Sequence, residues 1–283
     1  MRTYIVIPCH NEAAFIGQTL DSLLAQTHPA QEILVVDDQS TDASAQIVSA
    51  FAKAHPCIKL HQIQGTSTHQ PGSKVVSAFL HGLAQLDDNY DLICKFDADL
   101  IFPKNYLELI CKHFKSHPKT GIAGGFCYIE KDGHWQLENL TNKDHIRGAL
   151  KTYRKACFEA IGQLKPAMGW DTIDELLAQY HGWALYTDAS LQVKHLKPTG
   201  QKYTAKAYQK QGKAFYQMRY GLRLTIIASI KLALRKNNLL LAFQYLKGYM
   251  KAKTSKTEYL VSQPEGQFIR QLRWRGIRSK LMG

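Results

Sequence analysis

The feature that most constrains the fold is an alternation of short apolar runs with segments whose apolar residues recur at helical spacing. The apolar runs are rich in β-branched residues and cover residues 3–8, 32–36, 58–63 and 91–96, while residues 16–24 show the helical period. This order is typical of parallel strands joined by crossover helices. The sequence therefore predicts an α/β fold with a mostly parallel sheet flanked by helices.

Polar segments at residues 8–12, 37–42 and 97–99 directly follow three of these runs. Ligands of open α/β sheets bind outside the carboxyl ends of the strands, so we expect the three segments to meet at one edge. Asp97 and Asp99 stand at i and i+2, a spacing at which two carboxylates can hold a hard divalent cation. The pattern predicts a metal and diphosphate site, with solvated acids in a turn as the alternative.

Four motifs stand in register along the chain, namely Ile7-Pro8-Cys9-His10-Asn11-Glu12, Asp37-Asp38-Gln39-Ser40-Thr41-Asp42, Gly72 with Lys74, and Asp97-Ala98-Asp99. In order and spacing they resemble the family 2 glycosyltransferases of GT-A fold, over roughly residues 3 to 200. The resemblance implies a Rossmann-like sheet, a nucleotide-sugar donor and a divalent cation. It also implies inversion at the anomeric carbon, which is usual in that family.

A nucleotide-sugar donor needs a pocket for its base and positive charge near its phosphates. The resemblance implies a base contact on Asp37 or Asp38, with a helix N-cap and a solvated neighbour as the alternative. Lys74 opens a helix-like segment and could bring an ammonium group to the nucleotide, or it could be a solvated surface lysine. The full set of residues expected to bind the nucleotide sugar is Pro8, Asn11, Glu12, Asp37, Asp38, Lys74, Asp97, Ala98 and Trp170.

The expected cation is Mn²⁺ or Mg²⁺, bridging the two phosphates and bound by Asp97, Asp99 or both. His195 follows another apolar run and corresponds to a position where some members of the resembled family supply a further metal ligand. A histidine with a structural role is the alternative for His195.

The general base is expected in the acidic segment 170–175. In the resembled family the base is an Asp preceded by Glu and standing eleven residues before a Gly, and counting back from Gly182 gives Asp171. Trp170 replaces the usual Glu, which makes Asp174 the second candidate. Acids favoured by the dipole of a first helical turn are the alternative. Trp170 itself could stack on an acceptor sugar or belong to the core.

Charge divides the chain unequally. Residues 1–199 carry 18 basic and 21 acidic side chains, whereas residues 200–283 carry 18 and 2, a net charge of +16. We therefore expect a catalytic domain at residues 1–200 and a basic, mainly helical region at 201–283. Apolar segments in that region are interrupted by charges and are too short to span a bilayer.

The basic region could bind an anionic membrane surface or pack as a helical cap on the catalytic domain. A nucleic-acid-binding tail is disfavoured because no RNA- or DNA-binding motif accompanies its tyrosines and basic residues. Met1 leads almost directly into the first apolar run, which predicts a protein without a signal peptide. The six cysteines lack zinc spacing and are expected to be reduced thiols. We expect a cytoplasmic enzyme, either free or peripheral on the cytoplasmic face of the membrane.

The sequence thus predicts a metal-dependent hexosyltransferase of cell-envelope polysaccharide biosynthesis, acting on a hydroxyl of a glycan or a lipid-linked acceptor. Two other classes stay open. A nucleotidyltransferase is disfavoured because no early Gly-rich phosphate loop is present. A catalytically silent module that binds a nucleotide or an anionic surface is the third possibility.

Overall fold

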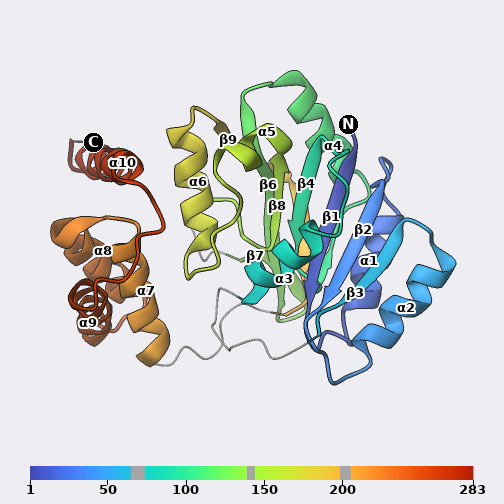
Figure 1. Cartoon of the computed structure of the whole chain (residues 1–283), viewed down its shortest axis with the longest axis horizontal. Helices are drawn as coiled ribbons and strands as arrows, with labels where there is room; N and C mark the ends of the chain where they lie inside the picture. Colours follow the sequence, from blue (N-terminus) through green and yellow to red (C-terminus); the bar gives the residue numbers. More distant parts are fainter. Residues whose placement is uncertain (65–73, 139–143, 198–204, 283) are drawn as a thin grey trace.

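The computed structural model describes residues 1–64, 74–138, 144–197 and 205–282 (Figure 1). The strands are β1 (Thr3–Cys9), β2 (Glu32–Asp37), β3 (Ile58–Gln62), β4 (Leu92–Phe96), β5 (Leu100–Ile101), β6 (Thr120–Lys131), β7 (His134–Leu137), β8 (Leu150–Arg154) and β9 (Ala184–His195). The helices are α1 (Ile16–Leu24), α2 (Ser44–Ala54), α3 (Lys74–Leu83), α4 (Tyr106–Ser116), α5 (Lys155–Ala160), α6 (Trp170–Tyr180), α7 (Ala205–Gln217), α8 (Gly221–Arg235), α9 (Leu240–Thr254) and α10 (Gln263–Met282). The predicted Gly72 and the predicted boundary at residue 200 lie outside the described residues.

One sheet organises the molecule, with the strand order β3-β2-β1-β4-β8-β6-β9-β5 and β7 paired to β6. Strands β3, β2, β1 and β4 run parallel, as the alternation of apolar runs predicts. Ile5, Val6 and Ile7 of β1 are all fully buried, because helices cover both faces of a parallel sheet. The predicted α/β fold is confirmed, and each predicted strand of this half is present.

The second half of the sheet mixes strand directions. Strand β8 runs antiparallel to both β4 and β6, β9 runs parallel to β6, and the short β5 pairs antiparallel with β9. Leu100 of β5 stands opposite His195 of β9 in this pairing. The end of β9 is thereby fixed beside residues 97–99, although nearly a hundred residues separate them in the sequence.

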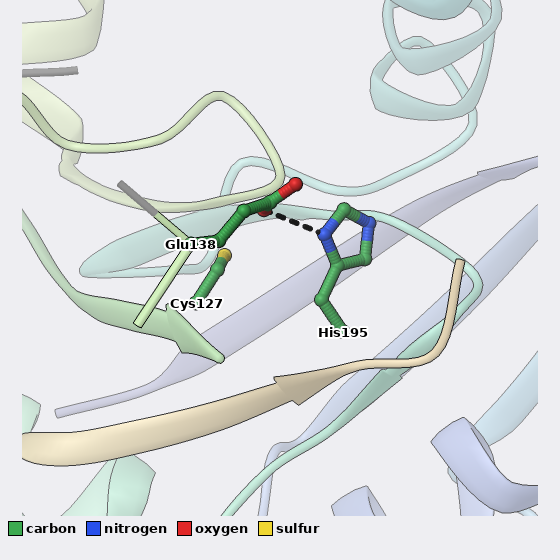
Figure 2. A group of neighbouring side chains, drawn as sticks. All are labelled: Cys127, Glu138 and His195. Carbon is green, nitrogen blue, oxygen red and sulfur yellow. Dashed lines mark hydrogen bonds and ion pairs between the residues drawn. The ribbon is translucent and has the colours of Figure 1, made fainter. Parts of the chain in front are cut away.

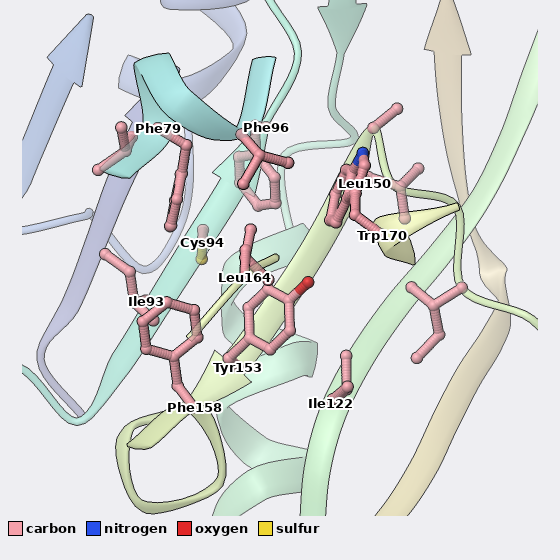
Figure 3. Packing of buried hydrophobic residues seen from close by; sticks show 14 of the residues in the cluster. Phe79, Ile93, Cys94, Phe96, Ile122, Leu150, Tyr153, Phe158, Leu164 and Trp170 are labelled. Carbon is pink, nitrogen blue, oxygen red and sulfur yellow. The ribbon is translucent and has the colours of Figure 1, made fainter. Parts of the chain in front are cut away.

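Aromatic side chains fill the core between the sheet and helices α3 and α5 (Figure 3). The ring of Phe158 lies 6.0 Å from that of Phe79 and 5.4 Å from that of Tyr153, both in edge-on geometry. Tyr153 stands opposite Ile93 in the pairing of β8 with β4. This packing holds β8 beside β4. Phe96, at the end of β4 and directly before Asp97, lies opposite Leu150 at the start of β8.

Helices α7 to α10 gather on one side of the molecule, away from the sheet and beyond α6 (Figure 1). Gly212 of α7 and Gly248 of α9 allow these two helices to touch, because a Cβ on Gly212 would lie 1.8 Å from the carbonyl oxygen of Tyr245. Helix α10 contacts α6 and so ties the four helices to the rest of the chain. Among the described residues, none of the helices has the length and apolar character needed to cross a bilayer.

Candidate functional site

The loop after β1 and the loop after β2 are joined by hydrogen bonds. Asn11, which has a positive φ of 55°, accepts the backbone N–H of Thr41 on its Oδ1 at 2.8 Å. In return its own N–H donates to Ser40 Oγ at 2.9 Å, and the N–H of Glu12 donates to Ser44 Oγ at 2.8 Å. The polar residues that follow two different strands are therefore one structural unit.

Asp37 and Asp38 lie at the carboxyl end of β2 and are 3 % and 7 % exposed. Pro8 of β1 stands beside them, opposite Val36 in the parallel pairing. Lys74, the first residue of α3, brings its Nζ to 3.9 Å from Asp38 Oδ2. The structure thus brings Pro8, both aspartates and Lys74 together at the same edge of the sheet.

The backbone of the Asp97-Ala98-Asp99 motif is held from two sides. The N–H of Asp97 donates to the carbonyl of Ala149 at 2.8 Å, and Thr19 Oγ1 of α1 donates to the carbonyl of Ala98 at 2.8 Å. The carboxylate of Asp97 forms an ion pair with Lys95. Asp99 is 8 % exposed. The motif sits where the sequence predicts it, directly after β4.

His195 joins this motif from the end of β9. Its Nε2 lies 3.4 Å from Asp99 Oδ2. Its Nδ1 lies 3.0 Å from Glu138 Oε2, the contact drawn in Figure 2. Burial alone would lower the pKa of His195, but its hydrogen bonds with Asp99 and Glu138 outweigh burial and raise the pKa to about 9. Glu138 also accepts a hydrogen bond from Arg147 Nη1 at 2.8 Å, so its carboxylate is fixed in place.

The donor atoms at this edge fit a hard divalent cation. Asp99 and His195 offer a carboxylate oxygen and an imidazole nitrogen 3.4 Å apart, donor types that suit Mn²⁺ or Mg²⁺ better than a structural zinc ion, while the carboxylate of Asp97 is paired with Lys95. Lys197 Nζ lies 2.7 Å from Glu12 Oε1, while Glu12 Oε2 is buried without a hydrogen-bond partner among the described residues. Burial raises the pKa of Glu12, and the charges of Asp99 and Asp97 add to that rise. An oxygen of this kind suits a cation or a ligand hydroxyl.

Among the described residues, one group of possible metal ligands has its ligand atoms close together, and it includes His195. The ligand atoms of Cys127, Glu138 and His195 lie within 4.8 Å of one another, and all three residues are buried (Figure 2). Burial raises the pKa of the Cys127 thiol to about 12, and sulfur is a softer ligand than the oxygens that Mn²⁺ or Mg²⁺ prefers. Glu138 therefore acts on His195 as a hydrogen-bond partner at Nδ1, which leaves Nε2 directed at Asp99.

The two predicted catalytic acids lie one turn apart in α6 but differ in surroundings. Asp174 is 2 % exposed, and Lys151 Nζ contacts both of its carboxylate oxygens, at 2.8 Å and 2.9 Å. Tyr153 also donates its hydroxyl to Asp174. The side chain of Asp171, in contrast, is 33 % exposed. Asp171 is therefore the acid of the two that can meet a ligand.

His145 lies between Asp171 and Glu175. Its Nε2 is 3.5 Å from Asp171 Oδ2 and its Nδ1 is 2.8 Å from Glu175 Oε2. Burial opposes the charged form of His145, but hydrogen bonds with Asp171 and Glu175 outweigh it and raise the pKa to about 9. Burial alone would raise the pKa of Asp171, but the hydrogen bond from His145 and the positive charge of Lys151 outweigh burial and lower the pKa to about 2.

Trp170 and two buried lysines connect α6 to the Asp97-Ala98-Asp99 motif. Lys95 and Lys151 stand opposite each other in the pairing of β4 with β8, with side chains 1 % and 0 % exposed. Their Nζ atoms lie 5.3 Å and 5.8 Å from the centre of the Trp170 ring, in cation–π geometry. Trp170 is 7 % exposed and belongs to the core. Through Trp170, the position of Asp171 depends on β4, the strand that Asp97 directly follows.

Three residues of this arrangement had no predicted role. His145 and Glu138 come from segments without a recognisable motif, and nothing in their sequence neighbourhood indicates a partner. For Lys151 only the structure gives a signal, because it lies in the buried strand β8, where an ammonium group requires a carboxylate partner.

Residues 4–164 match the family described as Glycosyl transferase family 2. The Probable glycosyltransferase YdaM of Bacillus subtilis is 36 % identical over 199 residues, which are 62 % of this chain and 44 % of YdaM. The Poly-beta-1,6-N-acetyl-D-glucosamine synthase of Staphylococcus epidermidis is 26 % identical over 153 residues, which are 53 % of this chain and 32 % of the synthase. The chain thus spans less than half the length of these two relatives.

Two solved structures share the fold. TarS 1–349 of S. aureus, in complex with UDP-GlcNAc, has a TM-score of 0.58 at 18 % identity, covering 75 % of this chain and 65 % of TarS 1–349. The mannosyltransferase PcManGT from Pyrobaculum calidifontis, in complex with GDP-Man and Mn²⁺, has a TM-score of 0.54 at 15 % identity, covering 98 % of this chain and 80 % of PcManGT. These likenesses confirm the predicted GT-A fold. Because the family match covers more than half of the chain, the chain belongs to the glycosyl transferase family 2.

Proposed function

We propose that this glycosyltransferase moves a hexose from a nucleotide-diphosphate sugar to a hydroxyl of a glycan or lipid-linked acceptor, with inversion. The contact between Asp99 and His195, 3.4 Å apart at the edge of the sheet that also carries Asp37 and Asp38, is the observation that carries the proposal. A metal and diphosphate site beside buried carboxylates for a base or ribose is what such a donor requires.

In this proposal the donor lies across the carboxyl edge of the sheet. Asp37 and Asp38 accept hydrogen bonds from the base or ribose, and Lys74 approaches the nucleotide from the start of α3. The remaining predicted contacts are Pro8, Asn11, Glu12, Asp97, Ala98 and Trp170, of which Trp170 acts from the core by supporting its neighbours. The buried ammonium groups of Lys95 and Lys151 hold the carboxylates of Asp97 and Asp174 in place before the donor binds.

Asp97, Asp99 and His195 would hold Mn²⁺ or Mg²⁺. The cation supplies Lewis-acid stabilisation of the charge that develops on the leaving diphosphate. Glu138 holds the His195 ring by its Nδ1, as hydrogen-bond partners of ligating histidines generally do.

Asp171 is the proposed general base. It takes the proton of the acceptor hydroxyl while the acceptor oxygen bonds to the anomeric carbon and the bond from that carbon to the diphosphate oxygen breaks. The nucleoside diphosphate leaves with the electron pair, so atoms and charge balance. With a pKa lowered to about 2 by His145 and Lys151 against the effect of burial, Asp171 is ionised at neutral pH. Asp174, held by Lys151 and Tyr153, fixes the helix instead.

The acceptor and the place of work follow from charge and from relatives. The named relative that makes a poly-N-acetylglucosamine makes a cell-envelope glycan the first acceptor class to test, and the UDP-GlcNAc complex of TarS makes UDP-GlcNAc the first donor to test. We propose that the protein works in the cytoplasm at an anionic membrane surface, because residues 200–283 carry a net charge of +16.

Calorimetric titration tests the donor site directly. UDP, UDP-GlcNAc and GDP-Man are titrated with and without MnCl₂ into the wild type, Asp99→Asn and the control Asp88→Asn. Asp88 precedes β4 and its side chain is 92 % exposed, so it lies at the opposite end of the strand from the motif. We expect Mn²⁺-dependent binding of one nucleotide class, lost in Asp99→Asn and kept in the control.

Two outcomes would contradict the proposal. Binding of equal strength without metal, unchanged in Asp99→Asn, would remove the metal and diphosphate site. Release of pyrophosphate from a nucleoside triphosphate and a sugar phosphate would assign the chain to the nucleotidyltransferases.

A further inference from the structure

Helix α8 exposes an apolar row beside a basic row. Its buried face consists of Leu224, Thr225, Ser229 and Ala233. On the opposite face, residues four apart form two neighbouring rows, one of Leu222, Ile226, Ile230 and Leu234 and one of Arg223, Ile227, Lys231 and Arg235. The apolar row is unusually open, with Ile230 45 % and Leu234 57 % exposed.

The apolar surface continues past the end of α8. Leu239, Leu240 and Phe243, at the start of α9, are 61 %, 72 % and 69 % exposed. Of the eleven exposed large hydrophobic residues in the described chain, eight fall between residues 222 and 243. Scattered exposed apolar residues need no explanation, but a concentration of this kind marks a contact surface. We call the exposed residues of 222–243 the α8–α9 surface.

Charge selects the partner of this surface. Neither α8 nor α9 contains an acidic residue, and residues 200–283 hold only two, Glu258 and Glu265. If a second copy covered the surface by twofold symmetry, it would set basic rows against basic rows. Nucleic acid would pair with the basic row, but it gives no reason for open Leu, Ile and Phe side chains. An anionic bilayer accepts both rows at once.

We infer that the α8–α9 surface lies on an anionic lipid bilayer, with the apolar row in the boundary between headgroups and acyl chains and the basic row at the lipid phosphates. The inference deepens the membrane location proposed above and identifies the face that makes it. Since α10 contacts α6, the lipid-bound helices would remain attached to the part of the chain that carries Asp171. Acceptors embedded in the same membrane would then be concentrated near the site.

Vesicle flotation without donor or metal tests this surface separately from the transferase proposal. The full chain is mixed with vesicles of phosphatidylcholine alone, or with vesicles of phosphatidylcholine that contain about 30 mol% phosphatidylglycerol. An apolar variant carries Ile226→Ser, Ile230→Ser and Leu234→Ser, and a basic variant carries Arg223→Gln, Lys231→Gln and Arg235→Gln. The matched control carries Lys251→Gln, Lys253→Gln and Lys256→Gln, three exposed lysines at the far end of α9 and just beyond it.

We expect the wild type and the control to float with the anionic vesicles and to remain in the bottom fraction when mixed with the neutral vesicles. The basic variant should bind about 100-fold more weakly, because each basic side chain near an anionic surface contributes roughly fivefold. The apolar variant should lose at least about tenfold at equal net charge, which separates insertion from charge alone. Far-ultraviolet circular dichroism checks that each variant keeps its helices.

Three results would overturn the inference. The first is equal binding of the wild type and the basic and apolar variants to anionic vesicles. The second is a wild-type dimer in light scattering that the apolar variant converts to monomer, which would assign the surface to a second copy. The third is full displacement of the protein from vesicles by RNA at equal phosphate concentration, which would assign the surface to nucleic acid.

Discussion

Asp171 and Asp174 stand one helical turn apart in α6, yet the side chain of Asp171 is 33 % exposed and that of Asp174 only 2 %. Lys151 accounts for the difference, because its buried Nζ contacts both oxygens of Asp174 and the backbone carbonyl of Asp171. Two acids that the sequence offers as candidates for the same role therefore differ because of one buried lysine. We therefore expect substitution of Asp171 to affect mainly activity and substitution of Asp174 to affect mainly stability.

Asp171→Asn should lower kcat by about 10² to 10⁴ and should lower the midpoint of thermal unfolding less than Asp174→Asn does, because His145 keeps Glu175 as a partner. An amide cannot accept the proton of the acceptor hydroxyl, but it can still pack beside His145. The measurement is a steady-state transfer assay with the donor identified by calorimetry, alongside a thermal melt. Near-normal turnover in a folded Asp171→Asn protein would show that Asp171 is not the base.

Asp174→Asn should act mainly on stability. Removing one charge of this buried pair leaves the Lys151 ammonium with Glu175, 3.2 Å away, as its remaining carboxylate partner and costs up to about 3–5 kcal/mol of unfolding free energy. Urea unfolding followed by circular dichroism measures the loss. The partner variant Lys151→Met removes the other charge, and the double variant should be more stable than the sum of the two single losses predicts. Additive losses would mean that the two side chains do not interact.

The ion pairs of His145 should make stability depend on pH. Its pKa is raised to about 9 in the folded chain, above the ordinary value near 6.5, so its stabilising contribution is complete below pH 6.5 and is lost as the pH rises through 9. His145→Gln should therefore lose on the order of 3 kcal/mol at pH 6 and much less at pH 9.5.

Unfolding free energies of wild type and His145→Gln between pH 6 and 9.5 test this dependence. His195 also has a pKa raised to about 9, but both proteins contain it, so its contribution cancels in the difference. A difference between the two proteins that stays constant over this range would contradict the pairing of His145 with Asp171 and Glu175.

Gly148 provides the space in which α6 begins. A Cβ at this position would lie 2.7 Å from Cζ2 of Trp170 and 3.1 Å from Cβ of Asp171. Gly148→Ala should therefore displace the first turn of α6, cost about 1–3 kcal/mol and lower kcat more than tenfold. Gly276→Ala is the matched control, because no atom lies within 4 Å of its added Cβ and alanine favours a helix. Equal activity of the two variants would show that the position of Trp170 and Asp171 is not critical.

Glu138→Gln should weaken Mn²⁺ binding by about 10- to 100-fold if His195 is a ligand, because the amide holds the ring less firmly at Nδ1. Electron paramagnetic resonance of free Mn²⁺ measures the affinity without any turnover. Glu130→Gln, an exposed acid near the end of β6, is the control. Unchanged affinity in Glu138→Gln would mean that His195 does not depend on Glu138 for its role.

The local features of this chain could be predicted well from its sequence. The strand that ends at Phe96 and the polar residues 97–99 after it follow from short-range hydrophobic pattern, as does the helix over residues 16–24. The strand ends of a parallel sheet share one edge, so the gathering of Pro8, Asp37 and Asp97 was also predictable.

The contacts across the chain could not be predicted in that way. His195 reaches Asp99 only because β9 pairs with the two-residue strand β5, and Glu138 reaches His195 from a segment after β7. The sequence by itself determined which groups follow each strand, because strand and helix periods are properties of neighbouring residues. Only the tertiary structure decided which of Asp171 and Asp174 is buried. Lys151 makes that difference, because it pairs with Asp174 only once β8 and α6 pack together.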